Sequence, residues 1–211
     1  MTRFSGHDLE CFRGGRTVFR GLGFEMAAGG ALVLTGANGS GKSSLLRLMA
    51  GLSPPVAGRF EWDGQAVAQD PEAHHRRLCY VGHLDPVKAA LTAGENLSFW
   101  ARLGGAADGR RAAQSALDTF GVGHLADLPA RYLSAGQRRR VNLARLLVSP
   151  ATLWLLDEPT TALDSAAKAS LADAIQRHRK SGGMVAMSAH AEAPVGDAGM
   201  LDLARFQAAR R

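Results

Sequence analysis

The chain has 211 residues, of which 46% are hydrophobic. That length fits one large domain, or one domain with an inserted subdomain, and that content fits a sizeable core. No stretch approaches the ~20 uninterrupted apolar residues that span a bilayer, and no signal peptide is visible. We therefore expect a soluble, cytosolic protein unless a partner holds it at a membrane. The net charge of +6 would allow nucleic acid or an anionic membrane as a partner, but we interpret it as a solvated surface.

The two cysteines predict no metal site. Cys11 and Cys79 lie far apart in strand-like segments and form no C-x-x-C spacing. Neither a zinc site nor a redox motif is indicated. We expect both to be buried free thiols.

A glycine-rich loop joins a strand-like run to a helix-like run near the N-terminus. Residues 4–28 predict two strands with a turn at 13–16, and residues 31–35 predict a buried strand. Residues 36–43 then have the spacing G-x-x-x-x-G-K-S and open a helix-like run at 44–50. In this context the motif predicts phosphate binding. The candidate ATP-binding residues of the loop are Gly36, Ala37, Asn38, Gly39, Ser40, Gly41, Lys42, Ser43 and Ser44.

Phosphate binding requires each residue type in the loop for a different chemical reason. The glycines allow backbone conformations that side chains forbid, so several N–H groups can point into one concavity and bind phosphate oxygens. Lys42 is expected to reach the β- and γ-phosphates, and the Ser43 hydroxyl to ligate Mg²⁺. Phe12, upstream of the loop, is a candidate for stacking on adenine. A core phenylalanine is an equal alternative at that position.

The middle of the chain changes from strands to helices. Residues 59–69 predict a hairpin, residues 72–77 are polar and basic, and residues 78–81 predict a short buried strand. Residues 84–132 then predict a helical subdomain inserted into an α/β core. Its expected helices are residues 93–103, residues 110–120 and a short one near His124.

Two carboxylates follow an apolar strand in the last third of the chain. Residues 153–156 predict a parallel strand buried on both faces, so Asp157 and Glu158 end it where open α/β sheets bind ligands. Asp157 is the expected second Mg²⁺ partner, directly or through water. Glu158 has no obvious structural purpose there and is placed to polarise an attacking water.

His190 follows another predicted buried strand, residues 184–188, which comes after a helix predicted at 165–180. A histidine at a strand end is more often a hydrogen-bonded core residue. Its place after two strands of the phosphate site favours a role in sensing or stabilising the γ-phosphate. A weak strand-like piece at 199–203 follows.

Four spaced motifs resemble those of ATP-binding cassette (ABC) ATPases, over essentially the whole chain. Residues 133–137, LSAGQ, resemble the signature loop L-S-G-G-Q, with Ala135 in place of a glycine, and open a helix predicted at 138–148. Residues 153–158 resemble the Walker B strand, residues 162–164 the D-loop, and His190 the switch histidine.

The resemblance implies a fold and a domain organisation. The fold is α/β, a P-loop NTPase with a mostly parallel core sheet, an N-terminal antiparallel β portion and an inserted helical subdomain. The chain would be a single domain, residues 1–211. Its catalytic core would be residues 1–83 and 133–211, and its helical subdomain residues 84–132.

The resemblance also implies a mechanism. Two copies pair head to tail, as a homodimer, and ATP with Mg²⁺ lies between the phosphate loop of one copy and the signature loop of the other. Glu158 and His190 are the expected catalytic residues. The residues expected to face ATP in trans are Ser134, Ala135, Gly136 and Gln137. Residues 138–140 either add positive potential at that helix start or form a solvated charge run.

One departure from the family pattern affects a metal ligand. The family usually has a glutamine after the strand at 78–81, which contacts Mg²⁺ and couples to the membrane partner. Here that position is His83, so the metal role does not carry over directly.

Residues 82–83, Lys88, residues 91–92 and residues 95–97 resemble one subfamily, the ATP-binding subunit of the haem exporter of bacterial cytochrome c maturation. It implies a peripheral protein on the cytoplasmic face of the inner membrane, bound to the integral-membrane subunits of that system and not to nucleic acid. The alternatives are another small ABC transporter and, in another class, a soluble ABC protein acting on ribosomes or DNA. A P-loop kinase would not explain residues 133–137 or Glu158.

Overall fold

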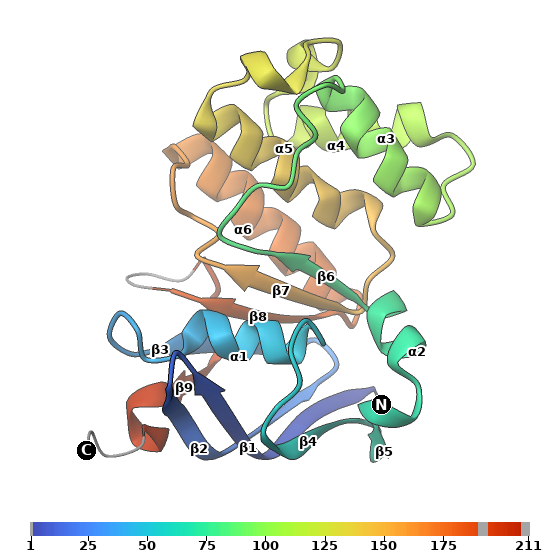
Figure 1. The fold of residues 1–211 in the computed structure, drawn as a ribbon. Helices are drawn as coiled ribbons and strands as arrows, with labels where there is room; N and C mark the ends of the chain where they lie inside the picture. Colours follow the sequence, from blue (N-terminus) through green and yellow to red (C-terminus); the bar gives the residue numbers. More distant parts are fainter. Residues whose placement is uncertain (1, 190–193, 208–211) are drawn as a thin grey trace.

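An antiparallel sheet forms the N-terminal layer of the computed structural model, which describes residues 2–189 and 194–207 (Figure 1). Its strand order is β2-β1-β4-β5. The strands are β1 (Arg3–Arg13), β2 (Arg16–Ala27), β4 (Ala57–Trp62) and β5 (Gln65–Ala66). Both predicted hairpins are confirmed. The second turns through Asp63 and Gly64, whose φ angles of 51° and 82° are typical of a tight Asp-Gly turn.

A parallel sheet forms the second layer, with the strand order β6-β7-β8-β3-β9. Its strands are β3 (Ala31–Thr35), β6 (Leu78–Val81), β7 (Leu153–Asp157), β8 (Met184–Ser188) and β9 (Gly199–Asp202). All residues of β7 and β8 are buried, as predicted for parallel strands covered on both faces. The carboxyl ends of β7 and β8 lie side by side because Asp157 pairs with Ser188.

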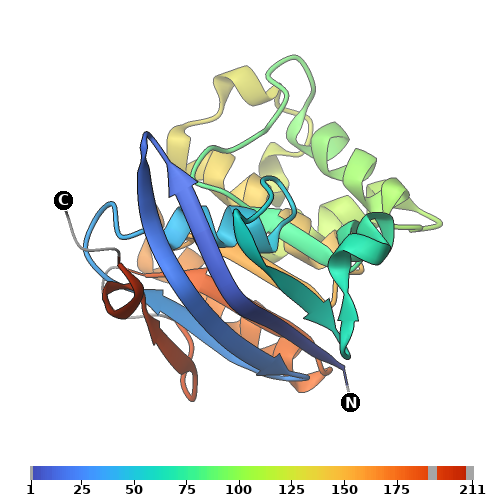
Figure 2. The same ribbon diagram turned by 60° about the horizontal axis from the view of Figure 1, so that its bottom comes forward.

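Alternate side chains of the parallel sheet enter two separate cores. Leu153 and Leu155 of β7 pack in the core that includes α1 (Lys42–Met49) and the antiparallel sheet. Trp154 and Leu156 pack on the opposite side, in the core formed with the later helices. Side chains alternate across a strand, so each strand ties the two layers together. Figures 1 and 2 show α1 between the two sheets.

Helices α5 (Ala135–Val148) and α6 (Ser165–Lys180) cover the other face of the parallel sheet (Figure 1). Helices α3 (Ala93–Leu103) and α4 (Gly109–Thr119) pack on each other and on α5, farther from the sheet. Short 3₁₀ turns lie at Val67–Gln69, Gly123–Leu125, Ala130–Tyr132 and Leu203–Phe206. The helices expected near 93–103, 110–120 and 165–180 are confirmed, whereas the division at 84–132 into core and subdomain stays a prediction. None of the helices in the described ranges is long and apolar enough to cross a bilayer.

Helix α1 ends before Leu52, and the segment after it contains a helix that the sequence did not predict. Leu52 lies beyond the end of α1 at Met49 and is 52% exposed. The polar segment at 72–77 contains a helix, α2 (Pro71–Arg76). It starts because the Asp70 carboxylate accepts a hydrogen bond from Ala73 N at 2.8 Å, and proline suits the first helical position.

The cysteine prediction is confirmed. Cys11 and Cys79 are both free and buried. Burial raises the pKa of each thiol, which leaves both in the unreactive protonated form at neutral pH.

Candidate functional site

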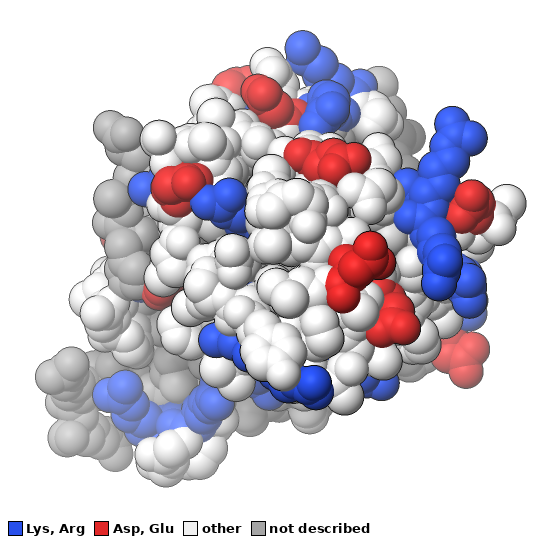
Figure 3. All heavy atoms as spheres, turned by 90° about the horizontal axis from the view of Figure 1, so that it is seen from above, with Lys and Arg blue, Asp and Glu red and all other residues white. Residues whose placement is uncertain are grey.

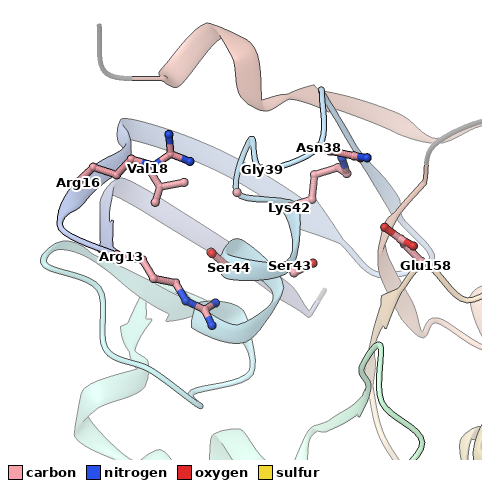
Figure 4. Close-up of a pocket in the computed structure, with 11 residues that line it drawn as sticks. Arg13, Arg16, Val18, Asn38, Gly39, Lys42, Ser43, Ser44 and Glu158 are labelled. Carbon is pink, nitrogen blue, oxygen red and sulfur yellow. The ribbon is translucent and has the colours of Figure 1, made fainter. Parts of the chain in front are cut away.

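A cavity lies between the β1–β2 turn, the glycine-rich loop and the end of β7 (Figure 4). It encloses about 540 Å³, within the usual range of small-ligand sites. Its lining residues are Arg13, Gly14, Arg16, Val18, Asn38, Gly39, Gly41, Lys42, Ser43, Ser44 and Glu158. The lining carries three cationic side chains and one carboxylate, which suits a polyanion.

The glycine-rich loop holds its lysine in place through its own backbone. Lys42 Nζ donates to the carbonyl oxygens of Gly36 at 2.7 Å and Ala37 at 3.2 Å. Gly36 and Gly41 have φ angles of 130° and 107°, which only glycine adopts without strain. An ammonium group has three N–H bonds, so Lys42 keeps one donor for a phosphate oxygen.

Ser43 and Asp157 come from distant segments and meet at the end of β7. Ser43 Oγ donates to Asp157 Oδ1 at 3.0 Å. The Ser188 hydroxyl donates to the same oxygen at 2.7 Å and accepts from Glu158 N at 2.9 Å. A hydroxyl and a carboxylate this close form the oxygen-only pair that Mg²⁺ prefers, so these residues fit the metal that the fold family implies.

Glu158 sits in a strained turn directly after Asp157. Its φ is 48°, an unfavourable value for a residue with a side chain, of the kind found at functional sites. Its side chain lines the cavity beyond Lys42 and Ser43 in Figure 4. The strand end therefore presents a carboxylate to the space where the loop would hold the terminal phosphate.

Arg139 fixes that turn, and the sequence reading missed it. The side chain is buried, and its Nη2 donates to the carbonyl oxygens of Asp157 at 3.0 Å and Glu158 at 2.9 Å. Its Nη1 donates to Gly82 O at 2.8 Å and to Asp85 Oδ1 at 3.0 Å. The interpretation of residues 138–140 as a solvated charge run is therefore wrong for Arg139.

The signature-like loop starts helix α5 three residues earlier than we expected. Ser134 Oγ accepts from Gln137 N at 3.2 Å, and Gln137 Oε1 accepts from Ser134 N at 2.8 Å. This reciprocal capping box starts the helix at Ala135, not at Arg138. Ser134 and Ala135 are exposed, and none of residues 134–137 lines the cavity.

Helix α5 also contacts the loop that precedes α6. Arg140 Nη2 lies 2.6 Å from Asp164 Oδ2. The hydrogen bond from the Ala167 amide lowers the pKa of Asp164 most, desolvation opposes it, and the charge and hydrogen bond of Arg140 lower the pKa further. A Cβ on Gly136 would lie 3.2 Å from the carbonyl oxygen of Ala162, so the helix start packs on this loop.

Two further predicted site residues lie away from the cavity lining, and a third lies outside the described residues. Phe12 is 56% exposed and does not line the cavity. The alternative of a core phenylalanine is therefore wrong, and its stacking on adenine stays a prediction. His83 is exposed, and its metal role also stays a prediction. His190 lies outside the described residues.

Comparison with known proteins defines the class. The profile of the family described as "ABC transporter" matches residues 19–161. A putative ABC transporter ATP-binding protein from Pyrococcus furiosus superimposes with a TM-score of 0.84 over 98% of this chain and 100% of that one, at 23% identity. A bacterial Atm1-family ABC exporter with ATP bound gives a TM-score of 0.82 over 95% of this chain and 36% of that one, at 25% identity.

Curated relatives share more of the sequence. The cytochrome c biogenesis ATP-binding export protein CcmA of Rhodospirillum rubrum is 57% identical over 96% of this chain and 86% of its own length. The protein of the same name from Paramagnetospirillum magneticum is 55% identical over 98% of this chain and 96% of its own length.

The chain therefore belongs to the ABC transporter family, as an ATP-hydrolysing subunit. Within that family it belongs with the CcmA proteins. The predictions of an α/β P-loop fold, of ATP as the nucleotide and of an ABC ATP-binding subunit are confirmed.

Proposed function

We propose that this chain powers the haem exporter of c-type cytochrome maturation by binding and hydrolysing ATP. One observation carries the enzymatic part: a single cavity brings together Lys42, Ser43 and Glu158 beside Asp157. The relatives named for cytochrome c biogenesis support the cargo pathway.

Each residue of the cavity has a chemical task. The loop amides and Lys42 bind the phosphates and hold the γ-phosphate in line for attack. Ser43 and Asp157 would hold Mg²⁺, which neutralises phosphate charge when bound. Glu158 polarises the attacking water and takes up its proton as a general base. His190 is the proposed γ-phosphate sensor.

A second copy of the chain completes the site. Residues 134–137 lie outside the cavity, and Ser134 and Ala135 face solvent at the start of helix α5. The first amides of a helix form an anion site. In a head-to-tail homodimer this helix start would meet the γ-phosphate held by the other copy, so ATP would act as part of the interface.

The proposed partners are integral-membrane subunits that the chain binds at the cytoplasmic face of the inner membrane. Support comes from large exposed apolar side chains in the helical segment: Leu84 at 81%, Leu103 at 69%, Tyr132 at 64% and Phe99 at 52% exposure. Large exposed apolar side chains often belong to protein interfaces. The surface seen from above Figure 1 is largely neutral at its centre, with charges of both signs around it (Figure 3).

Partner identification tests this proposal. Tagged Glu158→Gln protein, with ATP and Mg²⁺, is purified from detergent-solubilised native membranes, and the co-purifying chains are identified by mass spectrometry. We expect membrane subunits of cytochrome c maturation. Recovery of unrelated permeases would contradict the assignment to the haem pathway but would still support a role as a transporter ATPase. Ribosomal or DNA-bound partners alone would contradict both.

A further inference from the structure

The two ends of the cavity carry different side chains, and this difference indicates at which end the nucleotide base would lie. Figure 4 shows Glu158 at one end, Lys42 and Ser43 in the middle, and the β1–β2 hairpin with Arg13 and Arg16 at the other end. The lysine of this loop motif contacts the β- and γ-phosphates, and Glu158 lies beyond it. The base and ribose must therefore extend toward the hairpin.

A bulge brings the hairpin close to the phosphate loop. Cys11 pairs with Phe19 whereas Phe12 pairs with Thr17, so Val18 is an extra residue in β2. Such bulges re-aim side chains next to binding sites. Here Val18 lines the cavity, and a Cβ added at Gly41 would lie 2.6 Å from its Cγ1.

The hairpin offers arginines to the cavity, and not the phenylalanine. Successive side chains of a strand point to opposite faces. Arg13 lines the cavity, and its neighbour Phe12 is 56% exposed and does not. The side chain in reach of a base at this end is therefore the Arg13 guanidinium.

Among the described residues, these arginines also lack the acidic partners that their neighbours have. On the same sheet Arg3, Arg20 and Arg59 each pair with a glutamate. In the part of the chain that the structure describes, neither Arg13 nor Arg16 has an ion pair within 4.0 Å. Two uncompensated charges at the mouth of a polyanion site indicate a ligand that neutralises or stacks on them.

We infer that Arg13 stacks its guanidinium on the purine base of the bound nucleotide, with Val18 as the apolar contact beside it. This rests on the nucleotide site of the proposed function. A guanidinium is planar and weakly hydrated and stacks on aromatic faces. Stacking contacts the face of a base and does not read its edge, so ATP and GTP should bind with similar affinity. Arg16, whose Nη2 would lie 3.9 Å from a Cβ on Gly39, is placed nearer the phosphates.

Binding of three ligands separates base contacts from phosphate contacts. Calorimetry of the full chain with Mg²⁺ compares ATP, GTP and inorganic tripolyphosphate for the wild type, Arg13→Ala, Arg13→Tyr and Phe12→Ala. We expect Arg13→Ala to lower the affinity for both nucleotides about 10-fold and to leave the affinity for tripolyphosphate unchanged. Arg13→Tyr should restore nucleotide binding because an aromatic ring also stacks on a base. Phe12→Ala tests the competing prediction that Phe12 stacks on the base, and it should weaken nucleotide binding less than Arg13→Ala does.

The opposite results overturn the inference. An equal loss of affinity for ATP and for tripolyphosphate in Arg13→Ala would mean that Arg13 binds phosphate. A loss confined to Phe12→Ala would assign the stacking to Phe12, and a strong preference for ATP over GTP in the wild type would mean that the base edge is read. If the wild type bound neither ATP nor tripolyphosphate, while Lys42→Ala behaved identically, the proposed nucleotide site itself would be wrong.

Discussion

At the scale of single residues, Arg139 joins three separate segments behind the hydrolysis site. Its guanidinium binds the carbonyl oxygens of Asp157 and Glu158 on one side, and Gly82 and Asp85 on the other. These four hydrogen bonds satisfy three carbonyl oxygens and one carboxylate, so removal of the Arg139 guanidinium would leave all four acceptors without this partner. The residue therefore sets the backbone from which Glu158 reaches the cavity.

We predict that Arg139→Gln lowers the free energy of unfolding by about 3 kcal/mol, because one partner of a buried ion pair is lost. Hydrolysis should slow more than nucleotide binding weakens, since the phosphate loop is not in contact with this side chain. Urea denaturation and steady-state kinetics measure the two effects. Arg110→Gln, at an exposed site on α4, is the matched control and should change neither. Equal behaviour of the two variants would contradict the positioning role.

Some residues of the site were predictable from sequence, and others were not. The loop from Gly36 to Ser43 has a fixed spacing on contiguous residues, and local chemistry was enough to propose it. Arg139 lies in a run of three arginines that looks like a solvated face, and its partners are up to 57 residues away in the chain. Only the folded arrangement separates this buried arginine from its neighbours.

At the scale of elements, the start of helix α5 has two tasks that one substitution can separate. Ser134 caps the helix through Gln137, and the homodimer proposal also places its hydroxyl against the γ-phosphate of the other copy. Aspartate caps helices as well as serine does, but its charge would repel a phosphate. The capping task and the phosphate task therefore respond differently to Ser134→Asp.

We predict that Ser134→Ala lowers the free energy of unfolding by about 1 kcal/mol, whereas Ser134→Asp leaves it near that of the wild type. Both variants should lose ATP hydrolysis, and Ser134→Asp should lose more. Thermal unfolding and a phosphate-release assay give the two readouts. A stable Ser134→Asp protein with full hydrolysis would mean that the loop does not approach the nucleotide.

A buried histidine of helix α2, His74, forms a hydrogen bond to the last residue of helix α1. The Trp62 indole N–H donates to His74 Nδ1 at 3.0 Å, so the proton of this imidazole lies on Nε2, which is 3.0 Å from Met49 O. Burial, first, and then the charges of His75 and Arg77 lower the pKa of His74 from 6.5 to about 4, against a smaller opposing effect of the Met49 hydrogen bond. The folded protein therefore keeps His74 neutral where the unfolded chain takes up a proton.

This difference predicts a pH dependence of stability. Between pH 6.5 and about 4 the unfolded state binds more protons, so the free energy of unfolding should fall as the pH falls through that window. His74→Gln should be less stable at pH 7 and should show a shallower slope. Chemical denaturation at several pH values measures both. Parallel slopes for the wild type and the variant would contradict the assignment of this titration to His74.

The elements themselves show where sequence patterns are reliable. Strands β7 and β8 were predictable because continuous apolar runs suit strands buried on both faces. Helix α2 was not, because its six residues carry no apolar periodicity. The bulge at Val18 was also invisible, since it depends on the pairing of two strands and not on either strand alone.

At the scale of the whole molecule, one chain holds the phosphate loop and Glu158 in one cavity and presents the signature-like loop elsewhere. The motifs predicted the cavity, because the phosphate loop and residues 157–158 each follow a strand, and the α/β fold brings such strand ends to one edge of the sheet. The sequence did not predict the arginine end of the cavity. In the proposed homodimer, turnover requires two copies with ATP between them.

The measurement that tests this account most directly compares bound ATP and hydrolysis in the same Glu158→Gln preparation. We predict that the variant retains ATP, forms a dimer in size-exclusion chromatography with light scattering, and turns over at least about 100-fold more slowly than the wild type, as expected when a general base is lost. Lys42→Ala, as the control, should bind little ATP and stay monomeric. Undiminished steady-state hydrolysis by Glu158→Gln would contradict the general-base assignment and with it the mechanism proposed for the site.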